Sequence, residues 1–266
     1  MATPSSAGLL PDATSWTDVE SGESGATVLR DAAGERYAKI VAPAQADELA
    51  AERDRIVWLA ASGVPGPSVL EWNRTEQGAS LVTSAVTGTP ADQLDPEQLR
   101  AAWPAIADTL RRLHTVPVAD CPFDRGLARM MAAARTIVAE DRVQIDFLPV
   151  ALQDTSPADI LAGLESELPS REVQEEADAV VCHGDFCLPN ILVDPGASRV
   201  TGLIDLGRLG RADPYADIAL LLANARETWP DENTAREADE EFAARYGIAL
   251  DAGRQDFYLR LDPLTW

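Results

Sequence analysis

Basic residues are scarce in this sequence of 266 residues. Lysine and arginine together number 22 against 44 aspartates and glutamates, which gives a formal net charge of −22. Phosphate groups repel a chain this acidic, so neither nucleic acid nor an anionic membrane is expected as its main partner. The charge leaves room for a cationic ligand, and the hydrophobic content of 46 % is that of an ordinary folded protein.

Long apolar runs, cysteine and histidine are also nearly missing. No stretch approaches the roughly 20 apolar residues that span a bilayer, and the first residues lack the charged start and apolar core of a signal peptide. The three cysteines make no disulfide framework and favour a cytoplasmic location. No fourth ligand with zinc-like spacing follows Cys182, His183 and Cys187, which argues against structural zinc.

Lysine is the rarest basic residue, because 21 of the 22 are arginines and only Lys39 remains. A high-GC coding bias replaces lysine by arginine wherever either residue serves. Chance alone could leave one lysine, but a single survivor is also a candidate for a position that requires a compact ammonium group.

Apolar periodicity changes along the chain near Gly88. Before it, short strands are expected at 27–30, 36–41, 68–72 and 79–86, with one helix over 46–61. After a hinge at 87–90 the pattern is mostly helical, with helices expected at 96–114, 124–140, 157–167, 172–177, 215–227, 234–246 and 252–261 and an irregular insertion at 141–157. We therefore predict an α+β, bilobal fold with a small β-rich lobe, 1–88, and a larger, mainly helical lobe, 89–266.

The segment from 180 to 205 carries the strongest functional pattern. Two short apolar segments flank a turn at 194–198, so they are expected to form an antiparallel hairpin. Asn190 and Asp205 lie at equal offsets from the middle of that turn and should meet at the open end of the hairpin. Asp185 lies on the loop that leads into the first strand, so two carboxylates and an amide are expected at one edge.

Oxygen ligands of this kind suit Mg²⁺, and a carboxylate free of metal could accept a proton from a hydroxyl. The spacing His183-x-Asp185-x₄-Asn190 equals that of the catalytic loop of protein kinases, with Gly184 in place of the arginine. Taken singly, a residue of this kind more often caps a turn or ends a strand than takes part in catalysis. Their combination favours a catalytic site.

Lys39 fits the same hypothesis of a kinase-like catalytic site. It lies on an expected strand after a small-residue loop that includes Ser24 and Gly25 and that could approach phosphates. The helix that follows carries Glu48 and Glu52 on one face, and one of them should pair with Lys39.

With these residues in view, the chain resembles the aminoglycoside O-phosphotransferases, which are similar to small kinases. The resemblance covers nearly the whole chain and rests on five segments, namely Tyr37–Ile40, Glu52–Leu59, Val181–Asn190, Gly202–Gly210 and Asp213–Ala219. Within that family, the tail 257–266 is most similar to the streptomycin 3''-phosphotransferases. Kanamycin-type 3'-enzymes tend to end in Asp-Glu-Phe-Phe, whereas here Pro263 follows Asp262.

The resemblance implies a role for each matching residue. Asp185 is then the catalytic aspartate, and Asn190 and Asp205 hold Mg²⁺. Lys39, oriented by Glu52, contacts the phosphates of the donor, ATP or GTP.

The same resemblance gives less specific roles to other residues. The backbone at Ser84 and Val86 would receive the edge of the nucleobase. Asp217 would anchor the catalytic loop, and His183 would brace it.

On the substrate side, the resemblance implies transfer of a phosphoryl group to streptomycin, a cation with two guanidinium groups. Carboxylates pair with guanidinium groups bidentately, and the candidates are Asp262, Asp154, Asp146 and the carboxylate of Trp266. Most other acidic residues are expected on a solvated surface, and the protein is expected to be a monomer or a dimer.

Three alternatives stay open at this point. A 3'-phosphotransferase of kanamycin-type substrates is the nearest, and a kinase of another small molecule such as choline, homoserine or a macrolide is a second. The third is a non-catalytic kinase-like binding protein. Such a protein would be expected to lack one of the four residues that the chemistry needs, and all four are present, namely Lys39, Asp185, Asn190 and Asp205.

Overall fold

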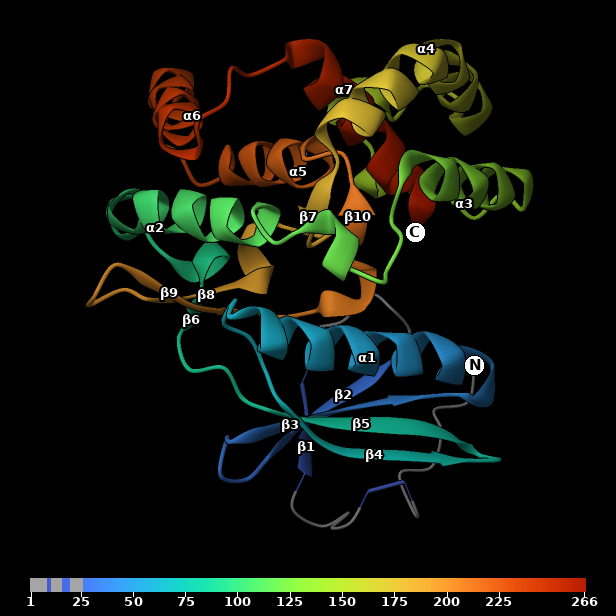
Figure 1. Cartoon of the computed structure of the whole chain (residues 1–266), viewed down its shortest axis with the longest axis vertical. Coiled ribbons are helices and arrows are strands. Elements are labelled where there is room, and N and C mark those ends of the chain that lie inside the picture. The colour runs from blue at the N-terminus through green and yellow to red at the C-terminus, as the bar shows by residue number, and fades with distance from the viewer. Residues whose placement is uncertain (1–8, 11–15, 20–25) are drawn as a thin grey trace. The chain divides into compact units, whose positions relative to one another are not determined.

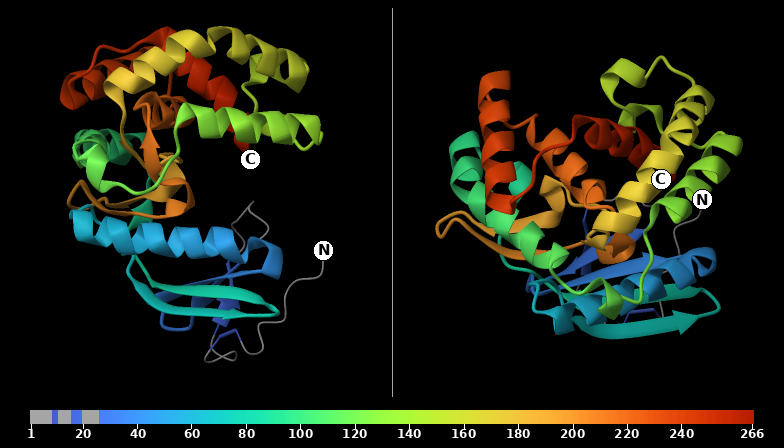
Figure 2. Two further views of the ribbon diagram at one scale, coloured as in Figure 1. Left: turned by 45° about the vertical axis from the view of Figure 1, so that its right-hand side comes forward. Right: turned by 45° about the horizontal axis from the view of Figure 1, so that its top comes forward.

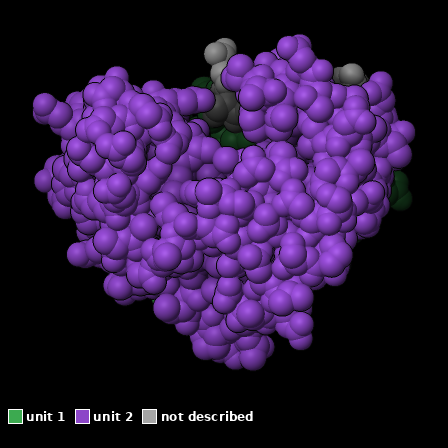
Figure 3. Space-filling view, turned by 90° about the horizontal axis from the view of Figure 1, so that it is seen from above, with its two compact units in different colours: residues 1–88, 201–207 green, residues 89–200, 208–266 purple. Residues whose placement is uncertain are grey.

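The computed structural model describes residues 9–10, 16–19 and 26–266 (Figure 1). The chain forms two compact units, coloured separately in Figure 3. The first unit comprises residues 1–88 and 201–207, and the second comprises 89–200 and 208–266.

The first unit is built on an antiparallel sheet of five strands in the order β1-β2-β3-β5-β4. The strands are β1 (Trp16–Asp18), β2 (Thr27–Asp31), β3 (Arg36–Val41), β4 (Val69–Thr75) and β5 (Gly78–Ser84). The helix α1 (Ala46–Ser62) packs along one face of this sheet (Figure 1). It ends at Gly63, whose φ of 79° is the left-handed conformation that terminates helices.

Six long helices make up most of the second unit. They are α2 (Pro96–His114), α3 (Leu127–Ala139), α4 (Pro157–Asp178), α5 (Tyr215–Ala225), α6 (Glu232–Tyr246) and α7 (Ala252–Leu261). Helix α2 packs against α6, and α5 packs against α7 (Figure 2). Trp103 of α2 is fully buried, and its indole N–H donates to the carbonyl of Ala238 on α6 at 2.8 Å.

Five short strands follow. Four of them belong to the second unit, and the fifth, β9, begins in the second unit and ends in the segment 201–207 of the first. Strand β7 (Val180–Cys182) pairs with β10 (Gly210–Ala212), and a second sheet has the order β6 (Thr89–Pro90), β8 (Ile191–Asp194), β9 (Arg199–Leu203). The predicted hairpin is therefore present as β8 and β9. Its turn is held by Asp194, whose Oδ1 accepts the backbone N–H of Gly196 at 3.1 Å.

Helix α4 differs from the sequence prediction, which broke it into two helices around Pro169. Proline lacks the N–H that would bond to the carbonyl four residues earlier, and this normally ends or kinks a helix. Here the helix continues through the proline, and Arg171 donates across it to Glu167 at 2.8 Å and outward to the carbonyl of Gly253 at 2.9 Å. In the part of the chain that is described, no helix is both long and apolar enough to cross a membrane.

Candidate active site

In the first unit, Lys39 lies on the central strand β3 and points to two carboxylates. Its ammonium nitrogen donates to Glu52 Oε2 at 2.9 Å and to Asp205 Oδ1 at 3.4 Å. Glu52 comes from the middle of α1 and is 9 % exposed, whereas Glu48, one turn earlier, is exposed. Of the two glutamates that the sequence left open, Glu52 is therefore the partner of the lysine.

Two opposing effects set the charge of Lys39. Burial alone would lower the pKa of this lysine, but the neighbouring carboxylates of Glu52 and Asp205 outweigh burial and raise the pKa above its usual 10.5. The lysine is therefore a fixed positive charge at neutral pH. Such a compact charge, held by two acids, suits the phosphates of a nucleotide.

Asp205 follows β9 with a strained backbone. Its φ is 58°, a left-handed value that non-glycine residues rarely adopt and that asparagine and aspartate tolerate best. Half of its side chain is exposed, at 49 %, while one oxygen lies against Lys39. Residues held in sparsely populated conformations gather at functional sites, so the strain agrees with a ligand-binding role for this carboxylate.

In the second unit, Asp185 lies on the loop between β7 and β8 and is 9 % exposed. Asn190 holds it, because the amide nitrogen Nδ2 donates to Asp185 Oδ2 at 2.8 Å and to the Asp185 carbonyl at 3.0 Å. The same nitrogen also lies 3.2 Å from the sulfur of Cys187. These contacts use the nitrogen of the amide, so its oxygen Oδ1 is the atom with which Asn190 could bind a cation.

Cys187 is a residue of this loop to which the sequence analysis gave no role. Its sulfur lies 3.6 Å from Asp185 Oδ1. Burial, followed by the charge of Asp185, raises the pKa of the thiol well above its usual value, so the sulfur keeps its proton. The thiol is therefore a weak donor to the oxygen of Asp185 that Asn190 does not bond. Only its position two residues after Asp185 could have pointed to it.

The backbone of the loop is anchored by Asp217 on α5, which is fully buried. Its Oδ2 accepts the N–H of His183 at 2.7 Å, and its Oδ1 accepts the N–H of Gly184 at 2.8 Å. Gly184 has a φ of 81°, and a Cβ there would lie 2.4 Å from the carbonyl oxygen of Arg208. Glycine is thus required at the position where the kinase loop has arginine.

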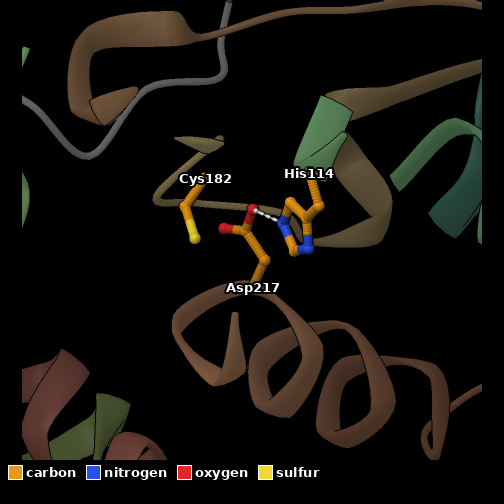
Figure 4. A group of neighbouring side chains, drawn as sticks. All are labelled: His114, Cys182 and Asp217. Atoms are coloured by element: carbon orange, nitrogen blue, oxygen red, sulfur yellow. Dashed lines mark hydrogen bonds and ion pairs between the residues drawn. The ribbon is translucent and has the colours of Figure 1, made fainter. Parts of the chain in front are cut away.

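Asp217 also lies in a cluster with His114 and Cys182 whose potential ligand atoms fall within 4.8 Å of one another (Figure 4). Both oxygens of Asp217 already accept backbone N–H groups, and His114 Nε2 bonds to Oδ2 at 3.1 Å. Burial raises the pKa of Cys182 far above its usual value, which keeps the sulfur protonated. The hydrogen bonds that occupy the Asp217 carboxylate assign this cluster to the support of the loop.

The C-terminal tail contains two of the residues expected to bind substrate. Asp262 Oδ1 accepts from Arg208 at 3.2 Å, and Asp262 Oδ2 accepts the indole N–H of Trp266 at 3.0 Å. The Arg208 guanidinium also stacks on the Trp266 ring, 3.2 Å from its centroid. Asp262 is thus paired within the chain already, and Asp154 is exposed in the 141–157 insertion.

Ser84, one of the two residues expected to receive the nucleobase, is the last residue of β5, and Val86 follows it by two positions. The N–H of Ser84 donates to the carbonyl of Ser68 at 2.9 Å, so this group extends the pairing of β4 and β5. Of the two backbone N–H groups, that of Val86 is therefore the better candidate for a base. Ser24 and Gly25 lie outside the described residues.

The five principal residues divide between the units. Lys39, Glu52 and Asp205 belong to the first unit, and Asp185 and Asn190 to the second. The convergence of Asn190 with Asp205 therefore stays a prediction of the sequence. The donor set itself, a carboxylate and an amide oxygen, fits a hard cation such as Mg²⁺.

Comparison with known proteins adds an independent result. Residues 15–258 match the model of the phosphotransferase enzyme family. Streptomycin 3''-kinase of Streptomyces griseus is 59 % identical over 251 residues, which are 94 % of this chain and 92 % of that protein. An aminoglycoside 3'-phosphotransferase of Streptomyces fradiae is 42 % identical over 259 residues, covering 93 % and 94 %.

Among solved structures, aminoglycoside phosphotransferase APH(3'')-Id of Streptomyces rimosus, in complex with ADP and streptomycin, is similar to this chain. The TM-score is 0.92 at 53 % identity, with 96 % of this chain and 94 % of that chain covered. The predicted fold class, a kinase-like α+β fold with a β-rich first part and a mainly helical second part, is thereby confirmed.

Proposed function

The chain belongs to the phosphotransferase enzyme family, and we propose that it transfers the γ-phosphoryl group of ATP to the 3''-hydroxyl of streptomycin, inactivating the antibiotic. The observation that carries this proposal is the 59 % identity to the Streptomyces griseus streptomycin 3''-kinase over 94 % of the chain. The likeness to a protein solved with both ADP and streptomycin supports it.

Asp185 has the surroundings that the proposed chemistry requires. Asn190 fixes one carboxylate oxygen at 2.8 Å, and the Cys187 thiol lies 3.6 Å from the other. A carboxylate held in this way can accept the hydrogen bond of the substrate hydroxyl, orient it toward the phosphorus and take its proton as the bond forms. Positioning supplies much of the rate in phosphoryl transfer, so the anchored backbone of the loop contributes together with the acid.

Lys39 would bind the phosphates of the donor. Glu52 holds the ammonium group from α1, and the raised pKa of the lysine keeps it charged. Asn190 Oδ1 and the Asp205 carboxylate would hold Mg²⁺, which neutralises phosphate charge when bound.

The substrate side depends on acidic groups. Streptomycin carries two guanidinium groups, which carboxylates of the helical unit can pair bidentately. Asp154 is exposed and open to such a contact, whereas Asp262 would have to exchange its Arg208 partner for the ligand. Asp146, exposed in the same insertion as Asp154, is a third candidate, and the net charge of −22 would favour approach of the cation.

A coupled assay of nucleotide consumption tests the proposal directly. Purified protein is given ATP or GTP with streptomycin, with kanamycin or without an acceptor. We expect turnover that depends on streptomycin, and mass spectrometry should find one phosphate on the 3''-oxygen. Turnover with kanamycin but not with streptomycin would assign the 3'-activity instead. If neither acceptor stimulates turnover, the protein would be a non-catalytic binding protein.

The role of Asp185 needs its own variant. Asp185→Asn keeps the shape of the side chain but removes the base, so kcat should fall by about 10³-fold while the fold is retained. Asp194→Asn, in the turn of the next hairpin, keeps its acceptor oxygen and should leave kcat unchanged. Near-normal turnover of Asp185→Asn would contradict the assignment.

Two further expectations accompany this proposal. The protein is expected to act in the cytoplasm and to be a monomer or a dimer. Fractionation of cells and light scattering of the purified protein test the two expectations separately.

A further inference from the structure

Three helices of the second unit meet around the imidazole of His114. His114 is the last residue of α2, Tyr246 is the last residue of α6, and Asp217 lies in the first turn of α5. The Tyr246 hydroxyl lies 2.6 Å from His114 Nδ1, and Asp217 Oδ2 lies 3.1 Å from Nε2. Figure 4 shows the imidazole pointing directly at the carboxylate of Asp217.

The direction of these hydrogen bonds follows from chemistry. The Asp217 carboxylate can only accept, so His114 Nε2 must carry the hydrogen in that bond. The Tyr246 hydroxyl keeps its proton, because burial raises the pKa of this tyrosine above its usual value. Tyr246 can therefore donate to Nδ1, and a continuous chain of hydrogen bonds runs from the hydroxyl through the imidazole to the carboxylate.

We propose that Tyr246 is a positioning residue for the phosphoryl-transfer loop, because its hydroxyl fixes the imidazole of His114 in the orientation that aims Nε2–H at Asp217. Asp217 in turn accepts hydrogen bonds from the backbone N–H groups of His183 and Gly184 at 2.7 and 2.8 Å. The next residue is Asp185, so the proposal rests on the catalytic role proposed for that aspartate.

Without the hydroxyl, the imidazole would lose its only bond at Nδ1 among the described residues. His114 is 7 % exposed and Asp217 is fully buried, so water has little room to replace the lost donor. The ring would then turn between alternative orientations, and Asp217 would be held by the loop alone. A small displacement of the loop reduces phosphoryl transfer more than it reduces binding.

Nuclear magnetic resonance of ¹⁵N-labelled imidazole tests the hydrogen bonds without any assay of activity. The chain has two histidines, His114 and His183, so the spectrum contains two ring systems and His114→Phe identifies each. We expect a neutral Nε2–H tautomer for His114, with an Nδ1 resonance typical of a bonded acceptor. In Tyr246→Phe that resonance should move toward the position of an unbonded nitrogen.

Kinetics test the consequence for catalysis. Tyr246→Phe keeps the ring that stacks on Phe242, and we expect kcat to fall by about fivefold with both KM values unchanged. Tyr258→Phe is the matched control, because it removes a buried hydroxyl for which the described residues offer no hydrogen-bond partner. That control should leave kcat and the resonances of His114 unchanged.

A double-mutant cycle separates positioning from packing. If Tyr246 acts through the imidazole, the kcat cost of Tyr246→Phe should disappear in a His114→Phe background. A packing role would give the same cost in both backgrounds and would overturn the proposal. So would an imidazolium or an Nδ1–H tautomer at His114 in the unmodified protein, an unmoved Nδ1 resonance in Tyr246→Phe, or an unchanged kcat in that variant.

Failure of the catalytic role of Asp185 would be recognised separately. In that case Asp185→Asn would retain its turnover, while the imidazole resonances of Tyr246→Phe would still shift as expected.

Discussion

The two units hold their functional side chains by different physical means. In the first unit, Lys39, Glu52 and Asp205 are connected by ion pairs between side chains at 2.9 and 3.4 Å. In the second unit, the loop of Asp185 is held through its backbone N–H groups by the buried carboxylate of Asp217. One arrangement places charges that can adjust to a ligand, and the other fixes the course of the main chain.

This difference suits two tasks. Nucleotide phosphates bind and dissociate in each turnover. The ammonium group that binds them is therefore better served by an ion-pair partner that can also contact the ligand, such as the half-exposed Asp205. The group that orients a hydroxyl for in-line attack gains from rigidity instead. Removal of a partner should therefore reduce stability in the second unit and nucleotide use in the first.

The largest expected effect comes from Asp217→Ala. The change removes the buried carboxylate that accepts the N–H groups of His183 and Gly184, which should lower the free energy of unfolding by about 4 kcal/mol. Urea denaturation of the purified variant measures the loss. Asp217→Asn, which keeps one acceptor oxygen, should lose less, and equal stability of both variants with the unmodified protein would contradict the anchoring role.

Glu52→Gln should have the next largest effect, on catalysis and not on stability. Lys39 would lose its closest partner and turn toward Asp205, so kcat/KM for ATP should fall by about 50-fold with KM for streptomycin unchanged. Thermal unfolding should hardly change, because the variant also relieves the burial of a carboxylate. Glu48→Gln, one turn away on the exposed face of α1, is the control and should retain full activity.

Lys39→Arg conserves the charge and tests the geometry. The planar guanidinium cannot take the compact place of the ammonium between Glu52 and Asp205, so kcat/KM for ATP should fall by about tenfold. Steady-state kinetics at varied ATP concentration measures the change. Unchanged kinetics would mean that the only lysine of this chain remained by chance.

The local parts of this organisation could be predicted from the sequence. The strands, the helix of Glu52 and the turn of the hairpin depend on periodicity and turn residues, which are local signals. The spacing of Asp185 and Asn190 identified the loop because both residues lie on one short segment. Lys39 was recognised by its rarity, and the sequence left open only whether Glu48 or Glu52 would hold it.

The long-range contacts could not be predicted in this way. Tyr246 and His114 are 132 residues apart, and no periodicity links the ends of two helices. Nor could the sequence tell that Asp262 would pair with Arg208, because that contact depends on how the tail packs. The sequence predicts separate helices at 157–167 and 172–177, whereas α4 continues through Pro169, where the bonds of Arg171 to Glu167 and to the carbonyl of Gly253 depend on tertiary packing.

The smallest expected effect is at the surface of the same two helices that carry His114 and Tyr246. Arg245 of α6 donates to Asp108 of α2 with both ends of its guanidinium, one of them at 2.9 Å. The hydrogen bonds from Arg245 hold the pKa of Asp108 below its ordinary 3.8, so the pair stabilises the fold above that pH and stops doing so as the pH falls through the lowered pKa. Arg245→Gln should therefore cost little stability at neutral pH, and nothing in acid or at high salt, where exposed charges are screened. Thermal melts across pH and salt measure this, and kcat should not change. A loss of kcat in Arg245→Gln would mean that the spacing of the helices, and not the hydroxyl of Tyr246, positions the loop.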